Sequence, residues 1–199
     1  MIYTYTDLTT SIANWIARSD LSAVIPEFIQ LAEDRINNDV NARDMETITT
    51  VTATAGNAYI NLPAGVLEIE RIVVNDTPLR VLTPISADQM ATAYVNGTSA
   101  KPANYSVIGG QVQLAPIPDS DYTIEIVYTS AVPSLLTNST NWLLTRNPSV
   151  YLWASLIEAA AYIQDPDKMN IAQQKYQEAV ARLNKTDWST YATPRVRSK

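Results

Sequence analysis

Residues 46–54 read Glu-Thr-Ile-Thr-Thr-Val-Thr-Ala-Thr, and this stretch decides the fold. Thr, Val and Ile branch at Cβ and favour extended backbone, so the stretch predicts a β-strand. Gly56 and Asn57 follow as a turn signal, and residues 58–62 are predicted to return as the second strand of a hairpin. The sequence before residue 45 has a helical periodicity instead, so a β region begins here.

Further short strands are separated by turn signals up to residue 130. They are predicted over residues 67–74, 79–82, 105–108, 111–114 and 122–128. The first two pair across the turn signal 75–78, and Gly109 with Gly110 joins the next two, because glycine tolerates positive φ. Residues 86–94, which begin with the cap-like Ser86, are predicted to form a short helix or an irregular crossing. Since every connection is short, a small antiparallel sandwich or barrel is predicted over residues 45–130.

Two helices are predicted on the N-terminal side of this β region, over residues 1–44. The first spans residues 6–18, with Thr6 or Asp7 as its cap, and its apolar residues follow the spacing of one helix face. That face is formed by Leu8, Ile12, Trp15 and Ile16. Pro26 marks the first turn of the second helix, where its missing N–H is harmless. The two helices are predicted to pair antiparallel.

Two more helices are predicted after the β region, over residues 131–186. Asn147 and Pro148 supply a cap and a first-turn proline for a helix that is apolar almost all round and therefore buried. An apolar stripe from Met169 to Leu183 predicts the last helix. The sequence therefore predicts an α+β protein: a four-helix bundle built from both chain ends, an inserted small antiparallel β domain, and an extended C-terminal tail over residues 187–199.

The 199-residue chain contains no histidine and no cysteine. Without these side chains it lacks Ser-His-Asp and Cys-His nucleophiles and the usual ligands of zinc, haem and iron–sulfur clusters. Pairs of carboxylates, as in glycosidases, are the remaining common route to hydrolysis. We therefore expect a protein that is not an enzyme and that needs no cofactor, metal or disulfide.

Charge and hydropathy argue against two further classes of protein, sequence-specific DNA-binding proteins and membrane-spanning proteins. A net charge of −6 opposes the cationic surface that sequence-specific DNA binding requires. Charged residues make up 17% of the chain, below the typical ~25%, and neutral polar surfaces suit contacts between subunits. No apolar run approaches the ~20 residues of a membrane-spanning helix. The first residues lack a secretory signal, so synthesis in a cytoplasm is expected.

The carboxylates offer weak catalytic candidates. Glu68 and Glu70 lie two residues apart on one predicted strand face, about 7 Å from each other, which overlaps the separations in glycosidases. Two solvated strand carboxylates are the simpler interpretation. Glu158 lies in the most apolar helix and is predicted to be an interhelix hydrogen-bond or ion-pair partner. Residues 119–121 and 165–167 alternate acidic side chains but lack the glycine and closing Glu of a calcium loop.

Most aromatic side chains, including Trp15, Tyr59 and Trp153, fall at positions predicted to face a core. Trp142 differs because it precedes the third helix in a predicted loop. We interpret it as an anchor into the β insertion or into a neighbouring subunit.

The predicted tail has a charge opposite to that of the rest of the chain. Arg195, Arg197 and Lys199 outnumber the single carboxylate of Asp187. Such a segment is suited to an acidic partner surface, although a frayed, solvated terminus would have the same composition. With Trp142, these three cations are the candidate docking residues.

Several short segments, in their order and spacing, resemble the adaptor family of short-tailed bacteriophages. They are Phe28-Ile-Gln-Leu-Ala-Glu-Asp-Arg-Ile-Asn37, Asp44-Met-Glu46, Leu62-Pro63, Gly109-Gly-Gln-Val-Gln-Leu-Ala-Pro116, Thr140-Asn-Trp-Leu-Leu-Thr-Arg-Asn-Pro148 and Tyr151-Leu-Trp-Ala-Ser-Leu-Ile-Glu-Ala-Ala160. The resemblance spans nearly the whole chain up to Asn184, and none of these motifs is catalytic.

The resemblance implies a helical bundle with a β insertion, located in the virion at the head–tail junction. Copies would form a ring with the twelve-fold symmetry of the portal protein above it, and the ring would connect to a tail nozzle protein. Genomic DNA would pass through the centre without sequence-specific binding, since a negative lumen repels phosphates. The resemblance does not extend to the C-terminal tail, which is expected from its charge to dock on the portal or on an adjacent copy.

A second function, from a different class, remains open at this point. The chain would be a polysaccharide-binding or glycan-degrading tail component that uses its β region and the carboxylates of Glu68 and Glu70. Incubation with bacterial envelope polysaccharide distinguishes the two functions: release of reducing ends that is lost on changing Glu68 or Glu70 would contradict the structural role.

Overall fold

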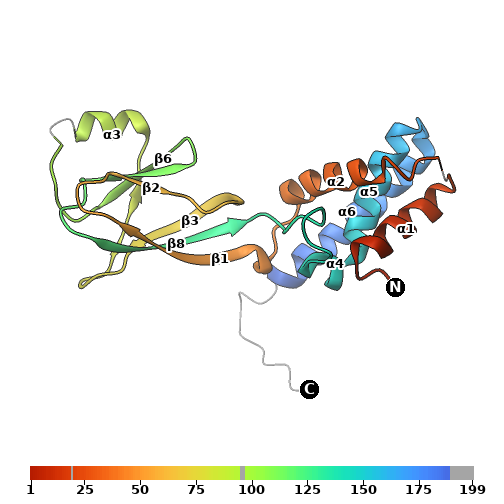
Figure 1. Ribbon diagram of the computed structural model, residues 1–199, viewed down its shortest axis with the longest axis horizontal. Coiled ribbons are helices and arrows are strands. Elements are labelled where there is room, and N and C mark those ends of the chain that lie inside the picture. The colour runs from red at the N-terminus through yellow and green to blue at the C-terminus, as the bar shows by residue number, and fades with distance from the viewer. Residues whose placement is uncertain (19, 95–96, 189–199) are drawn as a thin grey trace, which may run out of the picture. The chain divides into compact units, whose positions relative to one another are not determined.

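The computed structural model describes residues 1–18, 20–94 and 97–188. The chain divides into two compact units (Figure 1). The helical unit comprises Met1–Met45 with Val132–Lys199, and the β unit comprises Glu46–Ala131. Each unit has its own hydrophobic core. The protein is therefore of mixed α+β class, and both ends of the chain contribute to its helical unit.

The helical unit is built around one buried helix, α5. Its elements are α1 (Tyr5–Ile16), α2 (Ile25–Asp39), the 3-10 turn η1 (Arg43–Met45), α4 (Trp142–Arg146), α5 (Pro148–Tyr162) and α6 (Pro166–Trp188). Helix α5 contacts α1, α2, α4 and α6. Val150, Tyr151 and Ala154 on α5 are fully buried, which confirms the prediction from its all-round apolar sequence.

The helix termini follow local capping chemistry. Thr4, not Thr6 or Asp7, is the N-cap of α1, so that prediction was wrong. Asp7 takes the third helical position: its N–H donates to Thr4 Oγ1 (3.2 Å), and its Oδ2 accepts from Thr4 N (3.1 Å). This reciprocal capping box fixes the start of the helix two residues earlier. Pro26 lies in the first turn of α2, as predicted.

The C-terminal helices differ from the prediction at three places. Helix α4 was missed, because five residues are too few to show helical periodicity. Asn147 precedes α5, but its side chain makes no capping hydrogen bond, whereas Pro148 does occupy the first turn. Asp187 and Trp188 belong to α6 rather than to an extended tail, since the helix continues beyond its last apolar stripe residue.

The β unit contains two four-stranded sheets, ordered β1-β8-β3-β4 and β2-β7-β6-β5. Its elements are β1 (Glu46–Ala53), β2 (Tyr59–Asn61), β3 (Val66–Val74), β4 (Arg80–Val81), β5 (Thr83–Pro84), α3 (Ala87–Ala93), β6 (Asn104–Ile108), β7 (Gln111–Ala115) and β8 (Tyr122–Ser130). The predicted hairpins β3–β4 and β6–β7 are confirmed. So is the short helix α3, which Ser86 caps.

Two strand pairings correct the sequence analysis. β1 and β2 do not form a hairpin: β1 pairs with β8 in an uninterrupted antiparallel register, and β2 pairs with β7. The turn at Gly56 instead carries the chain from one sheet to the other. The pairing is also not wholly antiparallel, because β5 pairs parallel with β6. Helix α3 connects these two strands and supplies the crossover that parallel neighbours need.

The core of the β unit is formed by every second side chain along its strands. Ile124 and Ile126 on β8 are fully buried, and Tyr128 is 6% exposed, which confirms that one face of this strand is buried. Ile72 and Val74 on β3 join them in the same cluster. The opposite residues of β8 alternate outward, as the two-residue period of a strand requires.

The helical unit is expected to fold without the β unit. Replacing residues 46–131 by a short Gly/Ser linker is feasible because Glu46 and Thr129 are directly paired neighbours on β1 and β8. We expect the shortened chain to keep helical circular dichroism and cooperative thermal unfolding, since the core of the helical unit uses none of the deleted residues. A chain without helical signal would contradict this expectation.

Candidate interaction surfaces

A buried polar network joins the two sequence halves of the helical unit. Glu33 on α2 is 7% exposed, and its Oε1 accepts a hydrogen bond from Leu135 N at 2.6 Å. Asn141 Nδ2 donates to the hydroxyl of Tyr151 at 2.7 Å, and Asn141 Oδ1 caps α4 by accepting from Leu144 N at 2.8 Å. The connection between β8 and α4 is thereby fixed to both α2 and α5.

The hydroxyl of Tyr151 is the centre of this network. Burial raises the pKa of Tyr151 from its ordinary value of 10.0, the hydrogen bond from Asn141 lowers it, and the nearby Glu33 carboxylate, within hydrogen-bonding reach, raises it further. Burial also raises the pKa of Tyr176 on α6, whose hydroxyl donates to Asp39 Oδ2 at 3.0 Å, and that bond raises it further. Both tyrosines are therefore held protonated in the folded protein.

An ion pair connects α2 and α5 outside this network. Arg35 donates to Glu158 Oε1 from Nη2 at 2.6 Å and from Nε at 3.1 Å. The predicted interhelix partner role of Glu158 is confirmed. The Glu158 side chain is 18% exposed and that of Arg35 36%, so solvent screens the pair only in part.

An apolar hollow of about 310 Å³ opens between α1, α5 and α6. Trp15 and Trp153 form its aromatic wall, with ring centroids 5.1 Å apart in an edge-to-face arrangement. Trp15 is 56% exposed and Ile171 is 58% exposed, so the prediction that Trp15 faces a core was wrong: the ring packs on Trp153 at the rim. Among the described residues that line the hollow, Lys168 is the one that carries a charge. Exposed apolar surface of this kind is typical of proteins that assemble.

The carboxylates proposed for glycan hydrolysis, those of Glu68 and Glu70, are both exposed to solvent on β3. A hollow in the β unit, with a volume of about 510 Å³, includes Glu68 in its lining but not Glu70. Glu70 accepts a hydrogen bond from Thr129 Oγ1 at 3.1 Å. Both side chains are exposed on β3, where the register with β8 shifts at an irregularity next to Glu70. Two exposed carboxylates on one strand agree with the simpler interpretation, that they are solvated side chains.

Metal and membrane sites were searched in residues 1–18, 20–94 and 97–188. Within these ranges, no cluster of three or more acidic side chains could hold a metal ion. Helices of the same ranges are too short or too polar to cross a membrane.

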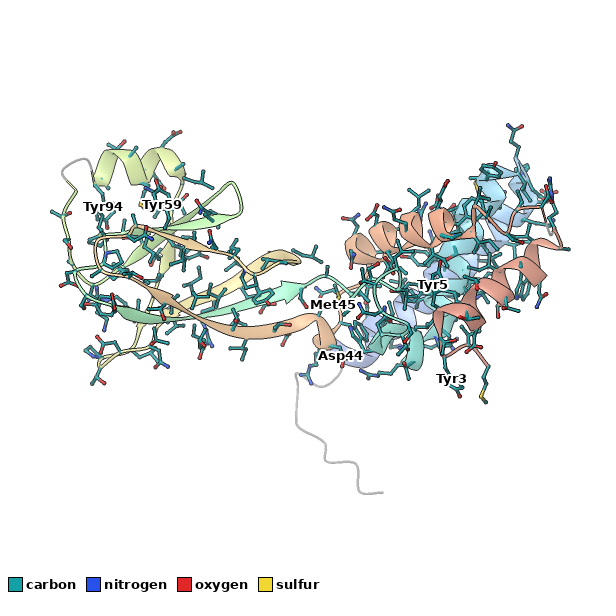
Figure 2. The ribbon with its side chains drawn as sticks, viewed as in Figure 1. Tyr3, Tyr5, Asp44, Met45, Tyr59 and Tyr94 are labelled. Atoms are coloured by element: carbon teal, nitrogen blue, oxygen red, sulfur yellow. The ribbon has the colours of Figure 1, made fainter. Side chains whose placement is uncertain are left out.

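The predicted docking residues fall in two places. Trp142 is the first residue of α4, not part of a loop, and its partly buried side chain packs against the core of the helical unit. In the same helix, Arg146 forms an ion pair with Asp44 of η1, which Figure 2 labels beside Met45 where the chain leads into β1. Arg195, Arg197 and Lys199 lie outside the described residues.

Comparison with known families places the whole chain in one group. A family model described as SU10 adaptor protein matches residues 3–198. The chain belongs to this family. The match confirms the resemblance drawn from the short sequence segments, and it identifies the chain as a phage adaptor protein, a structural component of the virion. No curated protein matches the sequence.

Two buried hydroxyls on α5 give a matched test of the polar network. Tyr151→Phe removes the hydroxyl that accepts a hydrogen bond from Asn141 and lies near Glu33, and it is expected to lower the free energy of unfolding by about 1–3 kcal/mol. The hydroxyl of Ser155 is fully buried and has no hydrogen-bond partner in the described part of the chain. Ser155→Ala is therefore expected to leave stability unchanged or to raise it by up to about 1 kcal/mol. Urea unfolding of the two variants measures both; equal losses would contradict this account.

Stability is expected to fall at alkaline pH. An unfolded tyrosine ionises near pH 10, while Tyr151 and Tyr176 stay protonated in the folded state, so their contribution is complete below that pH and is lost above it. The free energy of unfolding, measured between about pH 8 and pH 11, is expected to decline less steeply in the Tyr151→Phe/Tyr176→Phe variant. Tyr59→Phe, at a tyrosine that is 45% exposed, is the control and should keep the original decline.

Proposed function

We propose that copies of this chain form a ring between the portal and the tail nozzle of a phage, and that genomic DNA passes through the ring. The observation that carries this proposal is the match of the adaptor family over residues 3–198. The ring has twelve copies, following the portal. The chain binds the portal protein on one side and the nozzle protein on the other.

The chemistry of the chain supports this role. A net charge of −6 suits a passage for DNA, because a negative wall repels phosphates and lets the duplex slide. The exposed hollow at Trp15 and Ile171 supports assembly, since such apolar surface is costly to leave in water. Heterologous contacts between identical copies close a ring when the rotation between them fits.

The two units have different tasks in this proposal. Helices α1, α2, α5 and α6 act as a four-helix bundle that forms the frame of the ring, with α4 as an addition to it. The β unit is an insertion between the two halves of that bundle. Trp142, Arg195, Arg197 and Lys199 dock on the portal or on a neighbouring copy. The protein has no catalytic role.

Ring formation is expected to require the portal as a template. Each contact between copies must offset the loss of free motion on association, and the portal reduces this cost by holding neighbours in place. Sedimentation velocity is expected to show a monomer or weak association alone, and a defined complex with purified portal from the same phage. A closed ring of the chain alone at micromolar concentration would refute the template, and failure to bind portal would refute the adaptor role.

A further inference from the structure

Strand β1 forms an open edge of its sheet. It pairs with β8 over Glu46–Ala53 without a bulge, and no strand lies on its other side in the part of the chain that the structure describes. An edge strand presents backbone N–H and C=O groups to which another chain can add. Residues 48–53 of β1 therefore offer a template for an added strand.

The remaining sheet edges are protected, whereas β1 is not. β2 has three residues, β4 and β5 have two each, and β5 includes Pro84. β1 contains no lysine, proline or glycine, and most of its residues branch at Cβ. Ile48 at its centre is 65% exposed. Proteins rarely leave so long and regular an edge uncovered, because it promotes uncontrolled association.

The end of α6 indicates which segment is in position to cover this edge. Asn184 Oδ1 accepts a hydrogen bond from Asn41 N at 3.2 Å, and Asn184 Nδ2 donates to Asp39 O at 3.4 Å. Asn41 lies five residues before Glu46, the first residue of β1. Helix α6, which residues 189–199 follow in the sequence, therefore passes close to the chain that leads into β1. In a ring of equivalent copies, rotation about the axis preserves height, so this part of each α6 is level with the approach to β1 of the next copy.

Length and sequence of the C-terminal segment suit an added strand. Its eleven residues span about 36 Å when extended, against about 27 Å for the eight residues of β1. Pro194 is compatible with this role, because the added strand is itself an edge strand and its outer side needs no N–H.

The charges on the outer face of the β1-β8-β3-β4 sheet complement the segment. Glu46 and Glu68 both lie opposite Thr129, so their carboxylates share one face of the sheet. Glu125 lies four residues from Thr129 along β8 and is on the same face. Arg71 is near Glu125, with 3.6 Å between Nη2 and Oε1. In an extended strand, residues two apart point to one side. This side of the segment carries Arg195, Arg197 and Lys199.

We propose that residues 189–199 of each copy add as a strand to the β1 edge of the neighbouring copy, with the three cations on the acidic face of the sheet. The proposal rests on the ring proposed above, because the donor of the strand is a second copy. It links neighbours by backbone hydrogen bonds in addition to side-chain contacts.

Cysteine cross-linking tests the proposal directly, because the chain has no cysteine of its own. The Thr49→Cys/Val196→Cys variant, in which both cysteines lie on the face opposite the cations, is assembled on purified portal, treated with a short bismaleimide and separated by denaturing electrophoresis. A ladder of covalent multimers is expected. The control, Val107→Cys/Val196→Cys, places the first cysteine at an exposed residue of the inner strand β6 and is expected to give no ladder.

Three outcomes overturn the proposal and are distinguishable. A cross-linked monomer without a ladder means that the segment pairs with its own chain. If electron microscopy shows rings on the portal but no ladder of multimers forms, the ring assembles without strand addition. Absence of rings refutes the proposed function and this inference together.

Hydrogen exchange of the assembled rings gives an independent readout. The amides of β1 are expected to exchange at least ten-fold more slowly in rings of the full chain than in rings of a version ending at Trp188. Equal exchange of β1 in the two ring preparations would overturn the proposal. Amides of β6, which lies inside its sheet, serve as the reference and are expected to exchange equally in both.

Discussion

The buried carboxylate of Glu33 is the constraint on which the helical unit depends. It belongs to α2, yet its hydrogen bond reaches Leu135, which is 102 residues further along the chain. Burying a carboxylate without partners costs free energy. The packing of α2 is therefore favourable only when Leu135 and the hydroxyl of Tyr151 lie beside Glu33. The two ends of the chain must therefore come together as one folding unit, although a whole β unit separates them in sequence. This explains how a long insertion is tolerated: its entry and exit are joined by an interaction that the insertion does not supply.

Much of the fold could be predicted from local sequence signals, but strand pairings between distant segments could not. Pro26, Ser86 and the two glycines at 109 and 110 act on their immediate neighbours, so the elements that they begin or join were found from sequence. The partner of β1 could not be found in that way, because β8 lies some seventy residues away and a nearer apolar segment, β2, offered an apparent hairpin. The choice between them depends on which pairing completes a buried face, and this is a property of the whole sheet. Helix α4 was missed because its start depends on Asn141, whose orientation is in turn set by Tyr151.

The interaction surfaces show the same division. Glu158 stood out in sequence as a charge in an apolar helix, and its ion pair with Arg35 follows from the cost of burying it alone. The hollow beside Trp15 could not be derived, because it requires three helices to meet, and a tryptophan on an apolar stripe has the same pattern whether it lies inside or at the rim. For Glu68 and Glu70, an ideal strand spacing predicted a common site, but an irregularity in the ladder of β3 alters how neighbouring side chains are directed.

The register of β1 with β8 also has a mechanical consequence. Glu46 and Thr129 are partners, so the chain enters and leaves the β unit at the same end of one antiparallel ladder. A force that separates these two ends loads the first hydrogen-bonded residue pair alone, and then each following pair in turn. The same ladder pulled along the strands would load all its hydrogen bonds together. The β unit therefore yields most easily in the direction in which its own connections pull, and a force that draws Met45 and Val132 apart would peel β1 from β8 starting at Glu46.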